Sequence, residues 1–219
     1  MGAAADSSLD AMRLALAPAI ADAAAFDGWG EEAVRAAAEQ VGIDPDAALF
    51  AFSGGAIDMI DAWIAAIDAD MAAAFTAEQL AAMKIRERIR SLVQFRLDAI
   101  TWQQEALRRA LAIMAMPQNA PRALKLGWRS ADAMWRLAGD TSVDYNYYTK
   151  RTILAGIYAA TLAVFADDKS DNFADTGAFL DRRIDGIMRF EKAKAKWLNP
   201  DREHFSPARL LGRLRYPAR

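Results

Sequence analysis

The chain has 219 residues, of which 54% are hydrophobic and 26% charged, and its formal net charge is −2. This length and composition suit one large domain, or a small domain fused to a larger one, with a sizeable core. The sequence contains no cysteine, which excludes structural disulfides and thiolate zinc sites. It contains a single histidine, His204, which excludes a histidine-rich metal site.

Charge is distributed unevenly along the chain. Residues 1–60 contain two basic and ten acidic side chains, whereas residues 182–219 contain eleven basic and four acidic ones. We therefore expect the first segment to repel polyanions and the last to attract them. The longest uncharged stretch, 152–166, has 15 residues, fewer than the roughly 20 that a spanning helix needs. It predicts a buried helix in a protein that is soluble or lies on a membrane surface.

Apolar side chains recur at helical spacing along nearly the whole chain, and no segment alternates as a strand does. Glycine, proline and capping residues mark the boundaries between helices. The pattern therefore predicts an all-α fold of nine to ten helices. The expected helices cover residues 8–26, 31–41, 45–51, 55–74, 77–100, 102–116, 119–138, 144–166 and 174–198, with a short tenth near 207–215.

Two helix starts have the residues of a capping box, in which two side chains satisfy each other's backbone donors. One pairs Thr76 with Gln79, and the other pairs Thr101 with Gln104. We expect a helix to begin at each of them.

The first 75 residues contain a long predicted helix followed by four short segments, FDGW at 26–29, EEAVRAAAEQV at 31–41, GID at 42–44 and PDAALF at 45–50. They read as a Gly-aromatic step, a short helix, a tight turn and a second short helix. This order resembles the DNA-binding head of the TetR family, with the last segment in the place of the recognition helix, and it implies a TetR-like helical fold. Ala38, Val41 and Leu49 are the expected core positions.

The same head lacks the side chains that hold DNA. Affinity for DNA comes largely from Lys and Arg on phosphates, and base reading needs polar side chains on the recognition helix. Asp44 and Asp46 stand at the start of that helix, and no basic residue lies between Arg35 and Lys84. We expect a degenerate helix-turn-helix that is kept as a structural module and binds no nucleic acid.

The most specific pattern lies between residues 128 and 188. It consists of WRSAD at 128–132, AGDTSVDYNYYTKRTILAGIY at 138–158 and FLDRRIDGIM at 179–188. These segments resemble the lipid-binding accessory family of coenzyme Q (ubiquinone) biosynthesis, whose hallmark is approximately AGDxSTDFNWYTKR followed by FLDRRI. Val143, Tyr145 and Tyr147 replace the threonine, phenylalanine and tryptophan of that hallmark.

The resemblance implies a docking surface for the di-iron hydroxylase that modifies the quinone ring. Aromatic and arginine side chains suit this role because they bury a large area and keep a polar group. The residues alone leave a second interpretation open, in which the cluster only caps and joins two helices. The expected partner-binding positions are Trp135, Asp140, Asp144, Tyr147, Tyr148 and Arg151.

The resemblance also implies a pocket for a quinone or other isoprenoid lipid. Such a ligand needs a long apolar cavity, and methionine adapts its shape to a flexible chain. The alternative is that these apolar residues form an ordinary core. The expected lining consists of Leu92, Phe95, Leu111, Met114, Met116, Leu124, Trp128, Ile153, Ile157 and Phe165.

The C-terminal tail combines basic and apolar side chains. Basic groups are attracted to an anionic membrane surface, and apolar groups anchor at the interface. The alternative is a solvated end of the chain. The expected membrane-contact residues are Trp197, Arg209, Leu210, Leu211, Arg213 and Leu214.

These patterns predict a head at 1–75, a lipid-binding and dimerisation domain at 76–198 and a basic tail at 199–219. No Glu-x-x-His pair and no nucleophile–histidine arrangement is present, so we expect no catalytic residue, metal or cofactor. The implied function is a non-enzymatic accessory role in ubiquinone biosynthesis by a homodimer. Its expected place is the bacterial cytoplasm, peripherally on the inner membrane, or the matrix side of the mitochondrial membrane. The rival interpretations are a ligand-responsive transcriptional regulator and an enzyme acting on the quinone ring.

Overall fold

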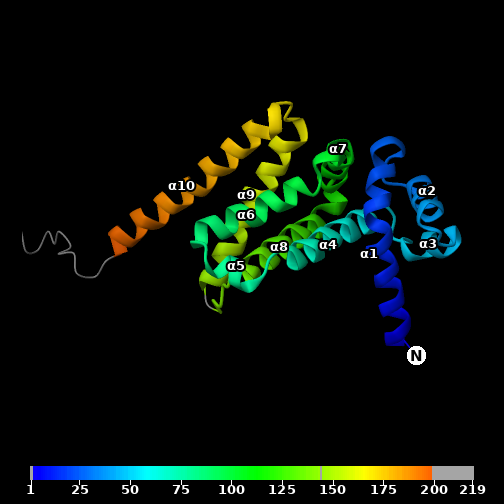
Figure 1. Cartoon of the computed structure of the whole chain (residues 1–219), viewed down its shortest axis with the longest axis horizontal. Coiled ribbons are helices and arrows are strands. Elements are labelled where there is room, and N and C mark those ends of the chain that lie inside the picture. The colour runs from blue at the N-terminus through cyan, green and yellow to red at the C-terminus, as the bar shows by residue number, and fades with distance from the viewer. Residues whose placement is uncertain (1, 144, 199–219) are drawn as a thin grey trace, which may run out of the picture. The chain divides into compact units, whose positions relative to one another are not determined.

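The computed structural model describes the backbone of residues 2–143 and 145–198 (Figure 1). Every regular element in these residues is a helix, which confirms the all-α prediction. Their bounds are α1 Gly2–Asp27, α2 Glu31–Val41, α3 Pro45–Ala51, α4 Ala56–Ala74, α5 Ala77–Ala81, α6 Ile85–Asp98, η1 Thr101–Gln103, α7 Gln104–Met114, η2 Pro117–Asn119, α8 Ala120–Leu137, α9 Tyr145–Asp167, η3 Asp171–Phe173 and α10 Ala174–Leu198.

Helices α1, α2 and α3 form the head, in which α1 packs against both shorter helices. The turn between α2 and α3 has a local cause. Gly42 takes a φ of 73°, which ends α2, and the Asp44 carboxylate accepts a 2.8 Å hydrogen bond from the Ala47 amide, which starts α3. Alanines fill the centre of the head, including Ala37, Ala38, Ala48 and Ala51.

Two of the three expected core positions in the head are not in the core. Val41 is exposed, and Leu49 is half-buried. Val41 is the last residue of α2, and the chain turns away at Gly42 directly after it. The close approach of three alanine-lined helices leaves Ala38 and Ala48 as the central side chains.

The head is joined to the following helices by tryptophan contacts. The Trp29 Nε1 donates to the Ala106 carbonyl at 3.0 Å, and the rings of Trp29 and Trp63 lie 5.3 Å apart. The Trp63 Nε1 in turn donates to the Gln103 side chain at 3.0 Å. Buried indole N–H groups need such partners, so these bonds fix the connection between α1 and α2 against α4 and α7.

The helix expected at 77–100 is two helices, α5 and α6. The predicted capping box of Thr76 and Gln79 is confirmed and starts α5. A new helix then begins after Lys84, because the Glu87 carboxylate accepts a 2.9 Å hydrogen bond from the Lys84 backbone N–H. This local bond competes with continuation of α5.

The second predicted capping box is wrong. The Thr101 hydroxyl donates backwards to the Asp98 carbonyl at 2.9 Å. The Gln104 side chain donates instead to the Phe165 carbonyl, at 2.7 Å, and to the Asp168 carbonyl. Gln104 therefore ties α7 to the end of α9 and does not cap its own helix.

The chain separates into two compact units, residues 1–181 and 182–219. The head and the bundle of α4 to α9 both lie in the first unit, where α8 packs along α9 and against α4. No single helix within 2–143 and 145–198 is long and apolar enough to cross a membrane; α3 and α4 reach that criterion only together, and they meet at 90°. The domain boundaries expected at 75 and 198 stay predictions.

Candidate functional site

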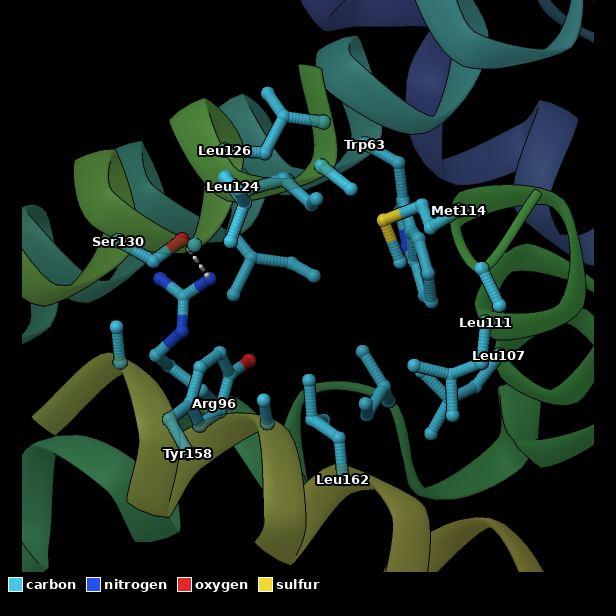
Figure 2. A pocket seen from close by; sticks show the side chains of 18 residues that line it. Trp63, Arg96, Leu107, Leu111, Met114, Leu124, Leu126, Ser130, Tyr158 and Leu162 are labelled. Atoms are coloured by element: carbon cyan, nitrogen blue, oxygen red, sulfur yellow. Dashed lines mark hydrogen bonds between the residues drawn. The ribbon is translucent and has the colours of Figure 1, made fainter. Parts of the chain in front are cut away.

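An apolar pocket of about 300 Å³ lies between α4, α6, α7, α8 and α9 (Figure 2). Its walls come from helices that are distant in sequence and meet in the bundle. They include Trp63, Ile64 and Ile67 of α4, Leu107, Leu111 and Met114 of α7, Leu124 and Leu126 of α8, and Ala155, Ala159 and Leu162 of α9.

Three of the ten expected lipid-binding residues line this pocket, namely Leu111, Met114 and Leu124. Leu124 is also exposed, which places it where the pocket meets the surface. Lipid binding by these residues stays a prediction, but the structure brings them together around one cavity.

The other seven do not line this pocket. Leu92 is fully buried in the core, Phe95 packs edge-on against Phe75, and Phe165 stacks near Phe173. Leu92 and Phe165 are buried core side chains, as in the alternative interpretation, whereas Phe95 is half-buried. The remaining four residues lie outside the pocket lining. Met116 lies between α7 and η2, Trp128 on α8, and Ile153 and Ile157 on α9.

The pocket uses a different face of α9 from the expected one. Ala155, Tyr158 and Leu162 follow each other at three- and four-residue spacing and share the lining face. Ile153 and Ile157 lie on the opposite side of the same helix, since each residue advances by 100°. Met116 is exposed after the end of α7, and Trp128 packs against tyrosines of α9.

One end of the pocket is polar, a feature that the sequence analysis missed. Arg96 of α6 is 1% exposed and lines the pocket together with Ser130 and Tyr158. Its Nη2 donates to the Ser130 hydroxyl at 3.1 Å, its Nη1 binds the Asp68 carboxylate, and its guanidinium lies 4.9 Å from the Tyr158 ring centroid. Burial lowers the pKa of Arg96, but the neighbouring Tyr158 and Asp68 outweigh it and hold that pKa above its usual value.

The hallmark motif forms a buried network of charges between α8 and α9. The Arg151 Nε donates to the Asp132 carboxylate at 2.5 Å, and its Nη1 donates to Asp140 at 2.9 Å. The Lys150 ammonium donates to the other Asp140 oxygen at 2.7 Å and to the Ser142 hydroxyl at 2.8 Å. Each charge therefore has a partner of opposite sign, as burial requires.

This network sets the protonation state of Asp140. Burial raises the pKa of the Asp140 carboxyl, but the hydrogen bonds donated by Lys150, Ser142 and Arg151 outweigh it and hold that pKa well below its usual range. The carboxylate is therefore charged in the folded protein at any pH above the acid range.

Two of the expected partner-binding residues are internal. The side chains of Asp140 and Arg151 are 4% and 2% exposed, because each is enclosed by its ion partners. Their side chains join α9 to α8 and to the segment after it, and their part in partner binding stays a prediction. Asp144 and the side chain of Trp197 lie outside the described part of the chain, as do Arg209, Leu210, Leu211, Arg213 and Leu214.

An aromatic patch, formed by Trp128, Tyr147 and Tyr148, lies over the charge network. The Trp128 ring is 6.2 Å from Tyr147 and 6.0 Å from Tyr148, and the two tyrosine rings are 5.1 Å apart. The Arg151 guanidinium lies 3.5 Å from the Tyr147 ring centroid and supports the patch from below. Tyr148 is 61% exposed and is its most accessible member.

Trp135 is held beside the patch. Its Nε1 donates to the Lys150 carbonyl at 3.0 Å, and the Lys150 ammonium lies 5.4 Å from its ring centroid. The ring is half-buried, so part of it is accessible to a partner.

The acidic loop after α9 is a helix cap. The Asp168 carboxylate accepts hydrogen bonds from the amide and hydroxyl of Ser170, at 2.8 and 2.6 Å, and from those of Thr176, at 2.8 and 2.6 Å. Burial raises the pKa of Asp168, but these bonds outweigh it and lower the pKa to about 2. No group of three or more His, Asp or Glu side chains that could hold a metal ion occurs among the described residues.

The surface of the head is acidic at the position of a recognition helix. The sequence of α3 contains no Lys or Arg, and Asp44 and Asp46 at its start are exposed. Arg35 of α2 pairs with Asp46 at 3.7 Å.

Comparison with known proteins identifies similar chains. Residues 120–191 match the model of the COQ9 family. The ubiquinone biosynthesis protein COQ9, mitochondrial, of Rattus norvegicus is 36% identical over 168 residues, which are 74% of this chain and 54% of the rat protein. The Homo sapiens protein of that name is 32% identical over 168 residues, 74% of this chain and 52% of its own. The chain spans about half the length of these curated relatives.

A solved structure shows the same fold. A TetR transcriptional regulator from Nitrosomonas europaea matches with a TM-score of 0.61 over 86% of this chain and 99% of that chain, at 23% sequence identity. This likeness confirms the prediction of a TetR-like helical fold.

Proposed function

We propose that the chain belongs to the COQ9 family, whose model its residues 120–191 match, and that it is a non-enzymatic accessory protein of ubiquinone biosynthesis. It binds a polyprenylated quinone precursor, or another isoprenoid lipid, in the pocket. It then hands this ligand to a di-iron hydroxylase that docks on the aromatic patch. The observation that carries the proposal is that the pocket and the patch adjoin along the same two helices.

The adjacency follows from residue spacing on α8 and α9. On α8, Leu124 at the pocket surface and Trp128 of the patch are four residues apart, which is one helical turn. On α9, Tyr148 of the patch precedes Ala155 of the pocket by seven residues, two turns along the same face. A protein that covers the aromatic patch therefore reaches the pocket opening.

The pocket suits an isoprenoid chain. Its lining is almost entirely aliphatic, aromatic or alanine, and Met114 adds a side chain that adapts to irregular shapes. Transfer of a prenyl chain from water into such a cavity is favourable in proportion to the apolar area covered. The protein contributes desolvation and presentation, and the partner contributes the bond chemistry.

The aromatic patch suits a protein partner. Tyrosine and tryptophan dominate binding energy at interfaces because they bury a large area with little loss of side-chain entropy. Here the buried pair of Arg151 and Asp140 holds the rings in place before binding. A preorganised surface loses less entropy on association than a mobile one.

The acidic head supports an accessory role over transcriptional regulation. The exposed Asp44 and Asp46 would face the phosphates of a duplex, and Arg35 is already paired. We expect no gel shift with duplex DNA even at low salt, where electrostatic binding is strongest. Tight binding of duplex DNA at low salt would favour the interpretation as a transcriptional regulator.

Membrane contact through the basic tail belongs to the same proposal. A carrier of isoprenoids must exchange its ligand with a bilayer, so a peripheral position on the membrane that holds the ubiquinone pathway is expected. Liposome flotation with anionic lipid should recover the full chain better than a chain ending at residue 199. Equal recovery would remove the tail from the mechanism. A homodimer through the last two long helices is the expected assembly, measurable by sedimentation.

The docking step is tested with matched aromatic variants. Tyr148→Ala should weaken binding to the ubiquinone-pathway hydroxylase by tenfold or more, roughly the effect of losing an interface anchor, while helicity is unchanged. The control is Trp102→Ala, which removes an exposed aromatic side chain from η1, outside the patch. If the two variants bind the hydroxylase equally well, the patch is not its docking surface.

A further inference from the structure

The polar residues of the pocket are gathered at one end. Figure 2 shows Arg96, Ser130 and Tyr158 together on one side of the cavity, with Leu107, Leu111 and Met114 on the other. Burying a charge is costly unless it is paired, and Asp68 supplies the partner for the buried Arg96 guanidinium.

The hydrogen-bond donors at this end are not all used. The Arg96 Nη1 binds Asp68 and its Nη2 donates to Ser130, but its Nε has no hydrogen-bond partner among the described residues although it is buried. The Tyr158 hydroxyl points into the cavity (Figure 2). Buried donors are nearly always satisfied in folded proteins, so an unused one beside a cavity indicates a missing acceptor.

The charge balance indicates which acceptor fits. Asp68 neutralises Arg96, and Arg129, which lies 3.6 Å from the other Asp68 oxygen, is itself paired with Asp61 at 2.5 Å. The end of the pocket therefore offers N–H and O–H donors with little uncompensated positive charge. A neutral oxygen, such as a ring carbonyl or a phenol, matches these donors without the desolvation cost that a phosphate or carboxylate would bring.

We propose that Arg96, Ser130 and Tyr158 form a recognition site for the oxygens of a neutral quinone or phenol ring. The inference rests on the proposed function, because it assumes that the same pocket binds the lipid. The ring enters first and lies against Tyr158, and the prenyl chain leaves past Leu124. A volume of about 300 Å³ is at the low end for ligand pockets, so a ring with a short part of its chain fills it.

This orientation gives the protein a guarding function. An oxygenated ring held at the Arg96 end is shielded from water, and transfer to the hydroxylase requires it to move out past Leu124 towards the aromatic patch. The polar end then also selects its cargo, because a plain isoprenoid hydrocarbon gains nothing from the donors and leaves them unsatisfied.

The test compares ubiquinone-1, a quinone with one prenyl unit, with prenylbenzene, a smaller hydrocarbon that has the same prenyl unit on a ring without oxygen. Calorimetric titration of the full chain should show ubiquinone-1 binding more tightly. Tyr158→Phe, which keeps the ring beside Arg96, should weaken ubiquinone-1 by roughly five- to tenfold, the effect of one lost hydrogen bond, and leave prenylbenzene unchanged.

The matched control is Thr161→Val. Thr161 is buried on the same helix, and its hydroxyl donates to the Ile157 carbonyl at 2.8 Å, away from the pocket lining. Its loss should alter neither affinity. Infrared spectra of carbonyl-labelled ubiquinone-1 supply a second measurement, in which the hydrogen-bonded carbonyl band of the wild-type complex shifts in Tyr158→Phe and not in Thr161→Val.

The outcomes separate this inference from the proposed function. Binding of both probes with the same ratio in wild type and Tyr158→Phe, and an unshifted carbonyl band, would overturn the oxygen site and leave the lipid pocket intact. Binding of neither probe would overturn both. Tighter binding of oleate than of ubiquinone-1 would assign the end of the pocket to a carboxylate and contradict a neutral ring.

Discussion

The head and the α8–α9 pair both contain many charges, but they place them in opposite environments. In the head, Arg35 and Asp46 face solvent, with side chains 50% and 89% exposed, at a separation of 3.7 Å. Between α8 and α9, Arg151 and Asp140 are enclosed at 2.9 Å. Exposed pairs contribute little to stability, whereas breaking a buried pair leaves an uncompensated charge. The charges of the head therefore lie where solvent reaches them, whereas those of α8–α9 hold the two helices together.

The same difference separates the parts of the hallmark motif. Its charged residues are internal and hold α9 against α8, and its aromatic residues lie outside them as the aromatic patch. The contacts of the charged residues agree with the interpretation that the cluster caps and joins two helices. Docking of a partner on the aromatic residues stays a prediction.

The largest effect is expected from Arg151→Met, which keeps the volume of the side chain and removes its charge. Asp132 and Asp140 would lose their buried partner, so the free energy of unfolding should fall by about 3–5 kcal/mol. Denaturant unfolding followed by circular dichroism measures this. Arg136→Met is the control, because Arg136 also pairs with Asp132 but is 71% exposed, and its loss should change stability by no more than about 0.5 kcal/mol. Equal effects of the two variants would mean that burial is not what distinguishes the network.

A smaller loss, about 2 kcal/mol, is expected from Asp168→Ala. This substitution removes the acceptor of four hydrogen bonds at the start of α10 and leaves the Thr176 amide, which is buried, without a partner. Thermal unfolding should show a lower midpoint, with the α9–η3 loop exchanging its amide hydrogens faster. An unchanged midpoint would show that the cap is dispensable.

The same carboxylate predicts a pH dependence. The pKa of Asp168 is lowered in the folded protein from 3.8 to about 2, so its bonds stabilise the fold fully above pH 4 and that contribution is lost as the pH falls from about 4 to about 2. Asp140, whose pKa is also depressed, acts in the same direction. Stability measured from pH 6 to pH 2 should fall less steeply in Asp168→Asn than in wild type, and parallel curves would contradict the assignment.

In the head, Asp44→Ala should cost about 1 kcal/mol, because it removes the N-cap acceptor of the Ala47 amide. The far-ultraviolet circular dichroism should stay nearly unchanged, since α3 is short. A loss as large as that of Arg151→Met would erase the contrast between the two regions.

The smallest effect is expected from Asp46→Ala, which deletes an exposed pair with Arg35. Stability should change by no more than about 0.5 kcal/mol. A larger change in the free energy of unfolding, measured by chemical denaturation, would show that exposed charges of the head also stabilise the fold.

Local signals explain how much of the fold could be predicted. The bounds of α2 and α3 agree with the prediction, because Gly42 and Asp44 act on their own backbone. The break between α5 and α6 was missed because it depends on a single bond from the Lys84 amide to Glu87, a competitor that helical periodicity does not register. The Thr101 capping box was wrong because Gln104 finds better acceptors in a distant segment.

The pocket was harder to predict because it depends on which face of α9 meets α8. Ile153 and Ile157 were chosen for their apolar character, but the spacing from Tyr148 through Ala155 to Leu162 marks the face that is used. Arg96 could have been found from sequence alone. It lies in the apolar stripe of α6 beside Leu92 and Val93, where a charged side chain is rare unless it has a buried partner.

We propose that this protein carries an isoprenoid bearing an oxygenated ring for another protein to modify. The decisive measurement is mass spectrometry of the lipids extracted from the purified chain. We expect one polyprenylated quinone or phenol per chain, depleted in Tyr158→Phe. Extracts that contain no isoprenoid, or only phospholipid, would contradict it.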